Sequence, residues 1–292
     1  MQQLNLSQEW INWIKENLAR GCDVNMLTNI MVGKGYAPSL AIQAITMIKE
    51  GKDITSVTNN IAGAMMGTER VDYTYETPRV PLNTNYIDTS DRRVYIGMKM
   101  EKPTIMTFDN LMSPEECDEL VKRSSGRMQQ SRVVDDATGK ESLHKDRTSE
   151  GTFFKFMEDD FIAMLDRRIA EVMHWPAENG EGIQILHYRP GGEYKAHFDY
   201  FPYDVAGSQR HLATGGQRVS TLVMYLNDVE QGGETTFPDI GVSVVPKKGS
   251  AVYFEYCNSK GQVDKLTLHA GNPVVKGEKW ICTKWMRQKK YS

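Results

Sequence analysis

The stretch of sequence that decides the fold runs from Ile185 to Phe201 and reads ILHYRPGGEYKAHFDYF. Aliphatic and aromatic residues are frequent in both halves, and Pro190, Gly191 and Gly192 between them favour a turn. The pattern predicts two short strands, Gly182–Tyr188 and Glu193–Phe198, joined by that turn.

Further short runs rich in Val, Ile, Tyr, Phe and Thr follow downstream, separated by Gly and Pro turns. They are Arg218–Asn227, Val242–Pro246, Ala251–Tyr256, Lys265–Leu268 and Trp280–Arg287. Seven or so strands at this spacing predict a sandwich or barrel, with a double-stranded β-helix (jelly roll) as the natural choice. Upstream, Leu111–Arg123 and Phe161–Val172 have helical patterns and are expected to support one sheet. The expected fold class is mainly β with supporting α.

The N-terminal region has a different period, with apolar residues three and four positions apart. It predicts a small three-helix domain over residues 1–55. The pattern of Leu27, Met31, Gly35, Tyr36, Ala41 and Ala44 resembles a ubiquitin-associated-type bundle, and a generic helical bundle is the alternative. Residues 56–102 are expected to form a linker and an irregular segment leading into a catalytic domain at 103–292.

Composition excludes several classes of protein. The 292 residues carry 35 basic and 38 acidic side chains, a formal charge of −3, which argues against a nucleic-acid partner. No run of 18 apolar residues predicts a membrane span, and the first residues do not resemble a signal peptide. The four cysteines form no CxxC pair, so we expect reduced thiols and a cytoplasmic protein.

The chemistry-bearing residues begin with His197 and Asp199. Residues two apart on a strand share one face, so the imidazole and the carboxylate are expected to converge. His269 is a candidate third ligand near the end of a late strand, followed by a turn. Two histidines and one carboxylate form the facial triad of non-haem iron(II) oxygenases, although this donor set alone leaves zinc open.

Lys279 lies ten residues after His269, within the turn-like Lys276-Gly277-Glu278-Lys279-Trp280. A fixed ammonium there suits the distal carboxylate of 2-oxoglutarate, whereas a solvated surface lysine is the alternative.

The sequence around these residues, from Pro103 to the end of the chain, resembles the prolyl 4-hydroxylase family of 2-oxoglutarate- and iron(II)-dependent dioxygenases. Besides Ile185–Phe201, the resemblance rests on Gly215–Val229, Gly232–Pro238, Pro246–Gly249, Leu268–Gly271, Gly277–Trp280 and Thr283–Trp285.

The resemblance implies a role for each matching residue. His197, Asp199 and His269 are expected to hold Fe(II), and Lys279 to bind 2-oxoglutarate. Tyr188 is expected to donate its hydroxyl to the same cosubstrate, with Thr221 in that pocket. Tyr194, Trp285 and Arg147 are the candidate substrate residues, the last in a substrate-covering loop.

The function predicted from the sequence is hydroxylation of a peptidyl proline with Fe(II), 2-oxoglutarate and O2, releasing succinate and CO2 and supported by ascorbate. The expected partner is a proline-containing protein or peptide, with a further protein partner for the N-terminal helices. One alternative is the same chemistry on another side chain, a small molecule or an alkylated base. Another is a non-catalytic jelly roll that binds peptides or metal.

Overall fold

The computed structural model describes residues 8–20, 22–32, 38–51, 73–130, 133–134, 141–142, 148–203, 205 and 207–291. The chain divides into two compact units, Met1–Asp72 and Tyr73–Ser292. No helix within these ranges is long and apolar enough to cross a membrane.

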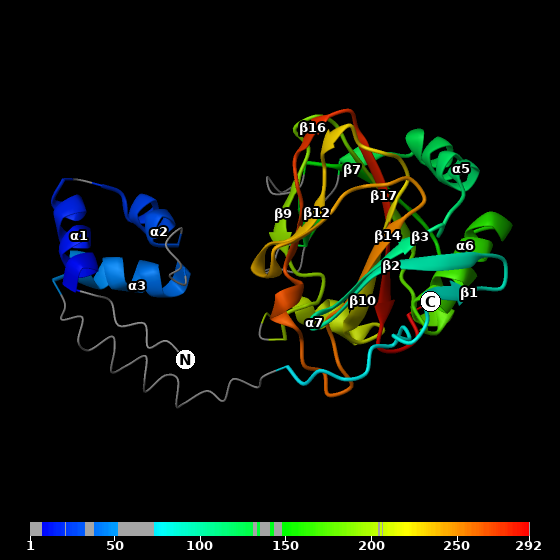
Figure 1. The fold of residues 1–292 in the computed structure, drawn as a ribbon, viewed down its shortest axis with the longest axis horizontal. Helices are drawn as coiled ribbons and strands as arrows, with labels where there is room; N and C mark the ends of the chain where they lie inside the picture. The colour runs from blue at the N-terminus through cyan, green and yellow to red at the C-terminus, as the bar shows by residue number, and fades with distance from the viewer. Residues whose placement is uncertain are drawn as a thin grey trace. The chain divides into compact units, whose positions relative to one another are not determined.

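The N-terminal unit contains α1 (Gln8–Ala19), α2 (Val24–Val32) and α3 (Pro38–Lys49) (Figure 1). One apolar cluster joins the three helices, because each contributes a buried stripe at helical spacing. Its fully buried members are Ile14, Leu27, Met31, Ala41 and Ile45.

The C-terminal unit is built on two antiparallel sheets. In spatial order the larger sheet contains β1 (Tyr86–Asp88), β2 (Arg93–Glu101), β3 (Thr104–Asp109), β14 (Ala251–Glu255), β10 (Arg218–Tyr225), β17 (Lys279–Arg287), β8 (Ile183–Tyr188), β7 (Glu150–Phe154) and β4 (Gln129–Gln130). The smaller sheet contains β13 (Val242–Val244), β12 (Thr235–Phe237), β15 (His269–Gly271) and β9 (Tyr194–His197). Two short pairs complete the strands, β11 (Gln231–Gly232) with β16 (Val274–Lys276) and β5 (Val133–Val134) with β6 (Glu141–Ser142). The expectation of a mainly β protein with a few helices is confirmed.

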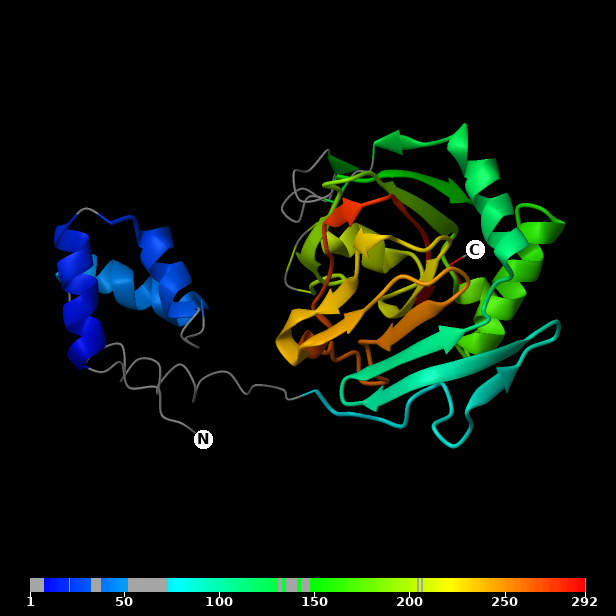
Figure 2. The same ribbon diagram turned by 45° about the horizontal axis from the view of Figure 1, so that its top comes forward.

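The longer helices of this unit, α5 (Pro114–Ser125) and α6 (Asp160–Val172), lie together beside the larger sheet (Figure 2). Ser113 and Glu116 form a reciprocal capping box that fixes the start of α5. The Asp159 carboxylate accepts two backbone N–H bonds at the start of α6. The remaining helical elements are α7 (Ser208–Ala213) and the 3₁₀ turns η1 (Ala177–Asn179), η2 (Pro238–Ile240) and η3 (Lys265–Thr267).

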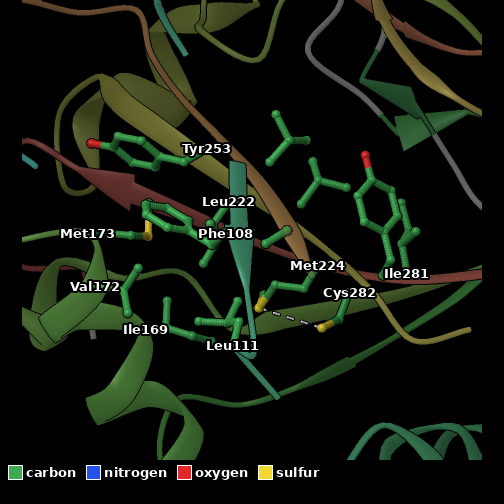
Figure 3. Packing of buried hydrophobic residues seen from close by; sticks show 14 of the residues in the cluster. Phe108, Leu111, Ile169, Val172, Met173, Leu222, Met224, Tyr253, Ile281 and Cys282 are labelled. Atoms are coloured by element: carbon green, nitrogen blue, oxygen red, sulfur yellow. Dashed lines mark hydrogen bonds between the residues drawn. The ribbon is translucent and has the colours of Figure 1, made fainter. Parts of the chain in front are cut away.

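The central strands of the larger sheet are buried on both faces. Leu222 and Met224 belong to the packed cluster that includes Ile169 of α6 (Figure 3). Because strand side chains alternate, Thr221 and Tyr225 belong to the opposite face of β10. That second face holds the candidate active site, so packing against the helices fixes the strands that carry it.

Two expectations about secondary structure are wrong. The supposedly irregular region 56–102 contains β1 and β2, outer strands whose many exposed residues give little apolar signal. Lys265–Leu268, expected as a strand, begins with η3, because the Asp264 carboxylate accepts the Leu266 N–H and caps a 3₁₀ turn. His269 therefore begins a strand, β15, and does not end one.

Candidate active site

Three side chains converge at the edge where β9 and β15 pair. His269 and His197 are directly opposed partners in this antiparallel pair, so their side chains share one face. Asp199 follows His197 by two residues. The ligating atoms of His197, Asp199 and His269 all lie within 4.8 Å of one another. The strand register thus brings the two imidazoles together, and the bend that follows β9 adds the Asp199 carboxylate.

Backbone carbonyls fix the orientation of both imidazoles. His197 Nδ1 lies 2.8 Å from the Lys195 carbonyl oxygen, and His269 Nδ1 lies 3.0 Å from that of Thr267. A carbonyl oxygen only accepts, so each Nδ1 must carry the proton and donate. Each Nε2 then keeps its lone pair, and both Nε2 atoms lie 3.6 Å from Asp199 oxygens. This tautomer is the one that a metal ion requires.

The charges at this point suit a cation. Burial by itself would raise the pKa of Asp199, but the imidazoles of His269 and His197 hold it well below its usual range. Burial and the neighbouring His197 lower the pKa of His269 to about 4. Near neutral pH the site therefore presents an ionised carboxylate and a neutral His269 imidazole.

Aromatic rings surround the two histidines. Tyr194 stacks on His197 at a centroid distance of 3.6 Å, and Phe254 and Phe237 lie 4.6 and 5.9 Å from His269. His197 is half-buried and His269 is buried. The rings restrict water around His269, while His197 remains accessible from one side.

Lys279 provides a buried cation at the start of β17. Its side chain is 3% exposed, and its ammonium lies 5.5 Å from the ring centroid of Tyr188 and 6.0 Å from that of Tyr225. Burial lowers the pKa of Lys279 to about 8, against an opposing influence of Glu234. Within the part of the chain that the structure describes, no carboxylate lies within 4 Å of the ammonium. A buried, unpaired ammonium suits an anionic ligand.

The surroundings of Lys279 include residues that sequence reasoning missed. Gly271 lies beside the lysine, since a Cβ built on it would lie 3.7 Å from Lys279 Nζ, an ordinary van der Waals distance. Thr235 is the register partner of Gly271, and its hydroxyl accepts a 2.8 Å hydrogen bond from Tyr225. Thr235 lies within the Gly232–Pro238 motif, but the motif does not indicate which residue lies beside it across the sheet. Only the strand register shows that.

The structure distinguishes among the other predicted site residues. Tyr188 pairs directly with Lys279 across β8 and β17, as a shared pocket requires. Thr221 is different, because its register partner is Trp285, six residues along β17 from Lys279. The Thr221 hydroxyl donates to Asp199 Oδ2 at 2.7 Å. Thr221 therefore contacts a candidate metal ligand, and its place in the cosubstrate pocket stays a prediction.

The candidate substrate residues occupy distinct settings. Tyr194 is partly exposed on β9 and stacks on His197. Trp285 is 8% exposed, with the Arg218 guanidinium 4.0 Å from its ring centroid. Its indole N–H is buried and has no hydrogen-bond acceptor among the described residues. Arg147 lies outside the described residues.

Comparison with known proteins gives a consistent result. The family model of the 2OG-Fe(II) oxygenase superfamily matches residues 183–287. Probable prolyl 4-hydroxylase 10 of Arabidopsis thaliana is 34% identical over 257 residues, covering 82% of this chain and 86% of the relative. The chain belongs to the prolyl 4-hydroxylase family of 2-oxoglutarate- and iron(II)-dependent oxygenases. Its cofactor is Fe(II) and its cosubstrate is 2-oxoglutarate.

Two further relatives agree with this assignment. Prolyl 4-hydroxylase 1 of Arabidopsis thaliana is 43% identical over 202 residues, covering 64% of this chain and 70% of the relative. Among solved structures, the 2-oxoglutarate complex of the viral collagen prolyl hydroxylase vCPH from Paramecium Bursaria Chlorella virus-1 is 30% identical, with a TM-score of 0.51. That match covers 63% of this chain and 95% of the viral chain. This family is the one that the sequence motifs indicated.

Proposed function

We propose that this 2-oxoglutarate-dependent dioxygenase hydroxylates proline residues in a peptide or protein. The observation that carries the proposal is the combination, in a prolyl 4-hydroxylase relative, of a two-histidine, one-carboxylate cluster with a buried Lys279 that has no carboxylate partner among the described residues. The iron ligands are His197, Asp199 and His269. Two neutral nitrogen donors and one carboxylate on one side suit Fe(II) and leave its other positions for cosubstrate and O2.

Lys279 binds the distal carboxylate of 2-oxoglutarate. Its ammonium is held by burial and by the rings of Tyr188 and Tyr225, so little side-chain freedom is lost on binding. Tyr188 donates its hydroxyl to the same carboxylate, and Thr235 and Gly271 line the pocket. When bound, Fe(II) with 2-oxoglutarate and O2 supplies the oxidising chemistry that hydroxylates a C–H bond, releasing succinate and CO2.

The peptide is placed by Tyr194 and Trp285. The half-buried Tyr194 ring offers an aromatic face beside a metal ligand, a surface that suits an extended proline-containing segment. Trp285 offers a buried N–H that lacks an acceptor among the described residues, which suits a peptide carbonyl. Arg147 remains a prediction as a substrate-orienting residue.

The test is succinate release by the iron(II)-loaded protein with 2-oxoglutarate, ascorbate and matched peptides. We expect proline-containing peptides to stimulate release, and the same peptides with alanine at each proline to leave the basal rate unchanged. Equal stimulation by both sets would exclude proline as the target and favour the same chemistry on another side chain. Omitting ascorbate in a parallel reaction tests its predicted supporting role.

The proposal also covers the architecture of the two sheets and the role of the N-terminal helices. We propose that the two sheets form a double-stranded β-helix and that α1–α3 form a helical bundle that recruits a protein partner. The shared apolar core of α1–α3 supports the bundle, and the recruiting role is a prediction that a truncation tests. Removing residues 1–72 should then lower activity on a whole protein substrate and spare activity on a short peptide. Equal losses on both would point to a stabilising role. A cytoplasmic location stays a prediction.

A further inference from the structure

Two buried hydroxyl groups lie behind the candidate metal site. Thr221, on the central strand β10, pairs with Phe254 of β14 and places its hydroxyl 2.7 Å from Asp199 Oδ2. Tyr256 follows Phe254 by two residues, so in an extended chain its side chain lies on the same face. The Tyr256 hydroxyl lies 2.9 Å from Thr221 Oγ1. Thr221 and Tyr256 are both fully buried.

The direction of these hydrogen bonds follows from the groups involved. A metal-binding carboxylate is ionised and only accepts. The single hydroxyl hydrogen of Thr221 is therefore given to Asp199. The hydrogen between Tyr256 and Thr221 must then come from Tyr256, which donates to the free lone pair of Thr221. The chain runs one way, from Tyr256 through Thr221 to Asp199 Oδ2.

This arrangement leaves the two oxygens of Asp199 unequal. Each oxygen lies 3.6 Å from one Nε2, Oδ1 from that of His197 and Oδ2 from that of His269, but only Oδ2 accepts a hydrogen bond, from Thr221; among the described residues Oδ1 has no side-chain donor. Building on the proposed function, we infer that Thr221 and Tyr256 are positioning residues that turn the Asp199 carboxylate so that Oδ1 is its metal-binding atom. Thr221 lies on β10 and Tyr256 directly follows β14, and both side chains are fully buried, so their hydroxyls have little room to move.

The measurable consequence is metal affinity in the absence of 2-oxoglutarate. Thr221→Val keeps the side-chain shape but removes the hydrogen-bond donor to Asp199. It also leaves the Tyr256 hydroxyl without its acceptor. Hydrogen-bond partners of metal ligands typically contribute about 10- to 100-fold to affinity, and we expect a loss of that size. Thr221→Ser restores the hydroxyl and should restore most of the affinity. Tyr256→Phe should cause a smaller loss.

The experiment titrates Co(II) into the full-length metal-free chain and follows its visible absorption. The spectrum reports ligand geometry, and the titration gives the dissociation constant, neither of which depends on turnover. Tyr253→Phe is the matched control. Tyr253 is equally buried on β14, but its hydroxyl donates to Glu255 at 3.0 Å, and its ring lies in the helix-side core (Figure 3). Its metal affinity should equal that of the unchanged chain.

The outcomes separate the inference from the proposed function. Unchanged Co(II) affinity in Thr221→Val, or a Thr221→Ser variant as weak as Thr221→Val, would overturn the inference. If Thr221→Val does not fold, Tyr256→Phe decides: an affinity no weaker than that of Tyr253→Phe overturns it. His269→Ala tests the metal site itself. Retained Co(II) binding in that variant would instead reject the ligand set on which both rest.

Discussion

His197 and His269 face each other across the β9–β15 pair with ring centroids 4.3 Å apart, although 72 residues separate them in the chain. Directly opposed residues of an antiparallel pair have Cβ atoms about 4.5–5.5 Å apart, so the sheet register itself sets this distance. The metal-binding geometry is consequently a property of the smaller sheet. A change that shifts its register should abolish metal binding even with all three ligands present.

Loss of one imidazole should remove metal and turnover together. In His269→Ala we expect no stoichiometric Fe(II) binding and no succinate release, because two donors remain where three are needed. Metal content after dialysis and succinate formation measure the two effects. His174→Asn, at an exposed position with φ of 47° that asparagine tolerates, is the control and should behave as the unchanged chain.

Lys279 should matter for the cosubstrate and not for the metal. Lys279→Ala removes a charge-assisted hydrogen bond worth about 1.5–3 kcal/mol, which corresponds to about a 10- to 100-fold weaker binding of 2-oxoglutarate. Calorimetric titration of the metal-loaded protein measures this loss. Lys276→Ala, which removes an exposed lysine paired with Glu230, is the matched control. Equal 2-oxoglutarate affinities in the two variants would reject the role of Lys279.

The same lysine predicts a pH dependence. Its pKa is lowered to about 8 because burial disfavours the charged form, so the ammonium is present below pH 8 and lost above it. Affinity for 2-oxoglutarate should be level up to about pH 8 and then fall, approaching about tenfold per pH unit. Lys279→Arg keeps its charge and should remove the decline. A decline that persists in this variant must come from another group.

A stability prediction concerns the helix-side face of the larger sheet. Arg168 of α6 is 2% exposed and pairs with Asp91 at 2.6 Å and Glu116 at 2.7 Å. Arg168→Met removes the close partner of both carboxylates, leaving Glu116 with only Arg92 at 3.5 Å as an ion-pair partner among the described residues, and should lower the free energy of unfolding by about 3 kcal/mol. Urea unfolding measures it. Arg93→Met breaks an exposed pair with Asp88 and should leave the unfolding midpoint unchanged.

The sequence predicted the parts of the site that depend on local spacing. The His197-x-Asp199 spacing predicted that the two side chains converge, although Asp199 lies in a bend just beyond the end of β9, and most strands carrying the site were visible as short β-rich runs. The partner of His197, the neighbours of Lys279 and the contact of Thr221 depend on register between distant strands. No local pattern contains that information, which is why the hydrogen bond from Thr221 to Asp199 and the position of Thr235 were missed.

The outer part of the larger sheet was missed for a different reason. β2 exposes alternate residues to solvent and contains Arg93, Lys99 and Glu101, so it has the polarity of a linker. The segment forms a strand because it pairs with β3, and its own composition does not indicate that pairing. In the same way, the capping carboxylate of Asp264 overrides the β-like composition of the segment that follows it.

Transfer of oxygen from O2 to proline is tested most directly by mass analysis of a proline-containing peptide and of succinate after reaction of the iron(II)-loaded protein under ¹⁸O₂. We expect one labelled oxygen on a proline of the peptide and one in succinate, with neither product labelled in His269→Ala. Labelled succinate with an unmodified proline, or label on another residue, would contradict it.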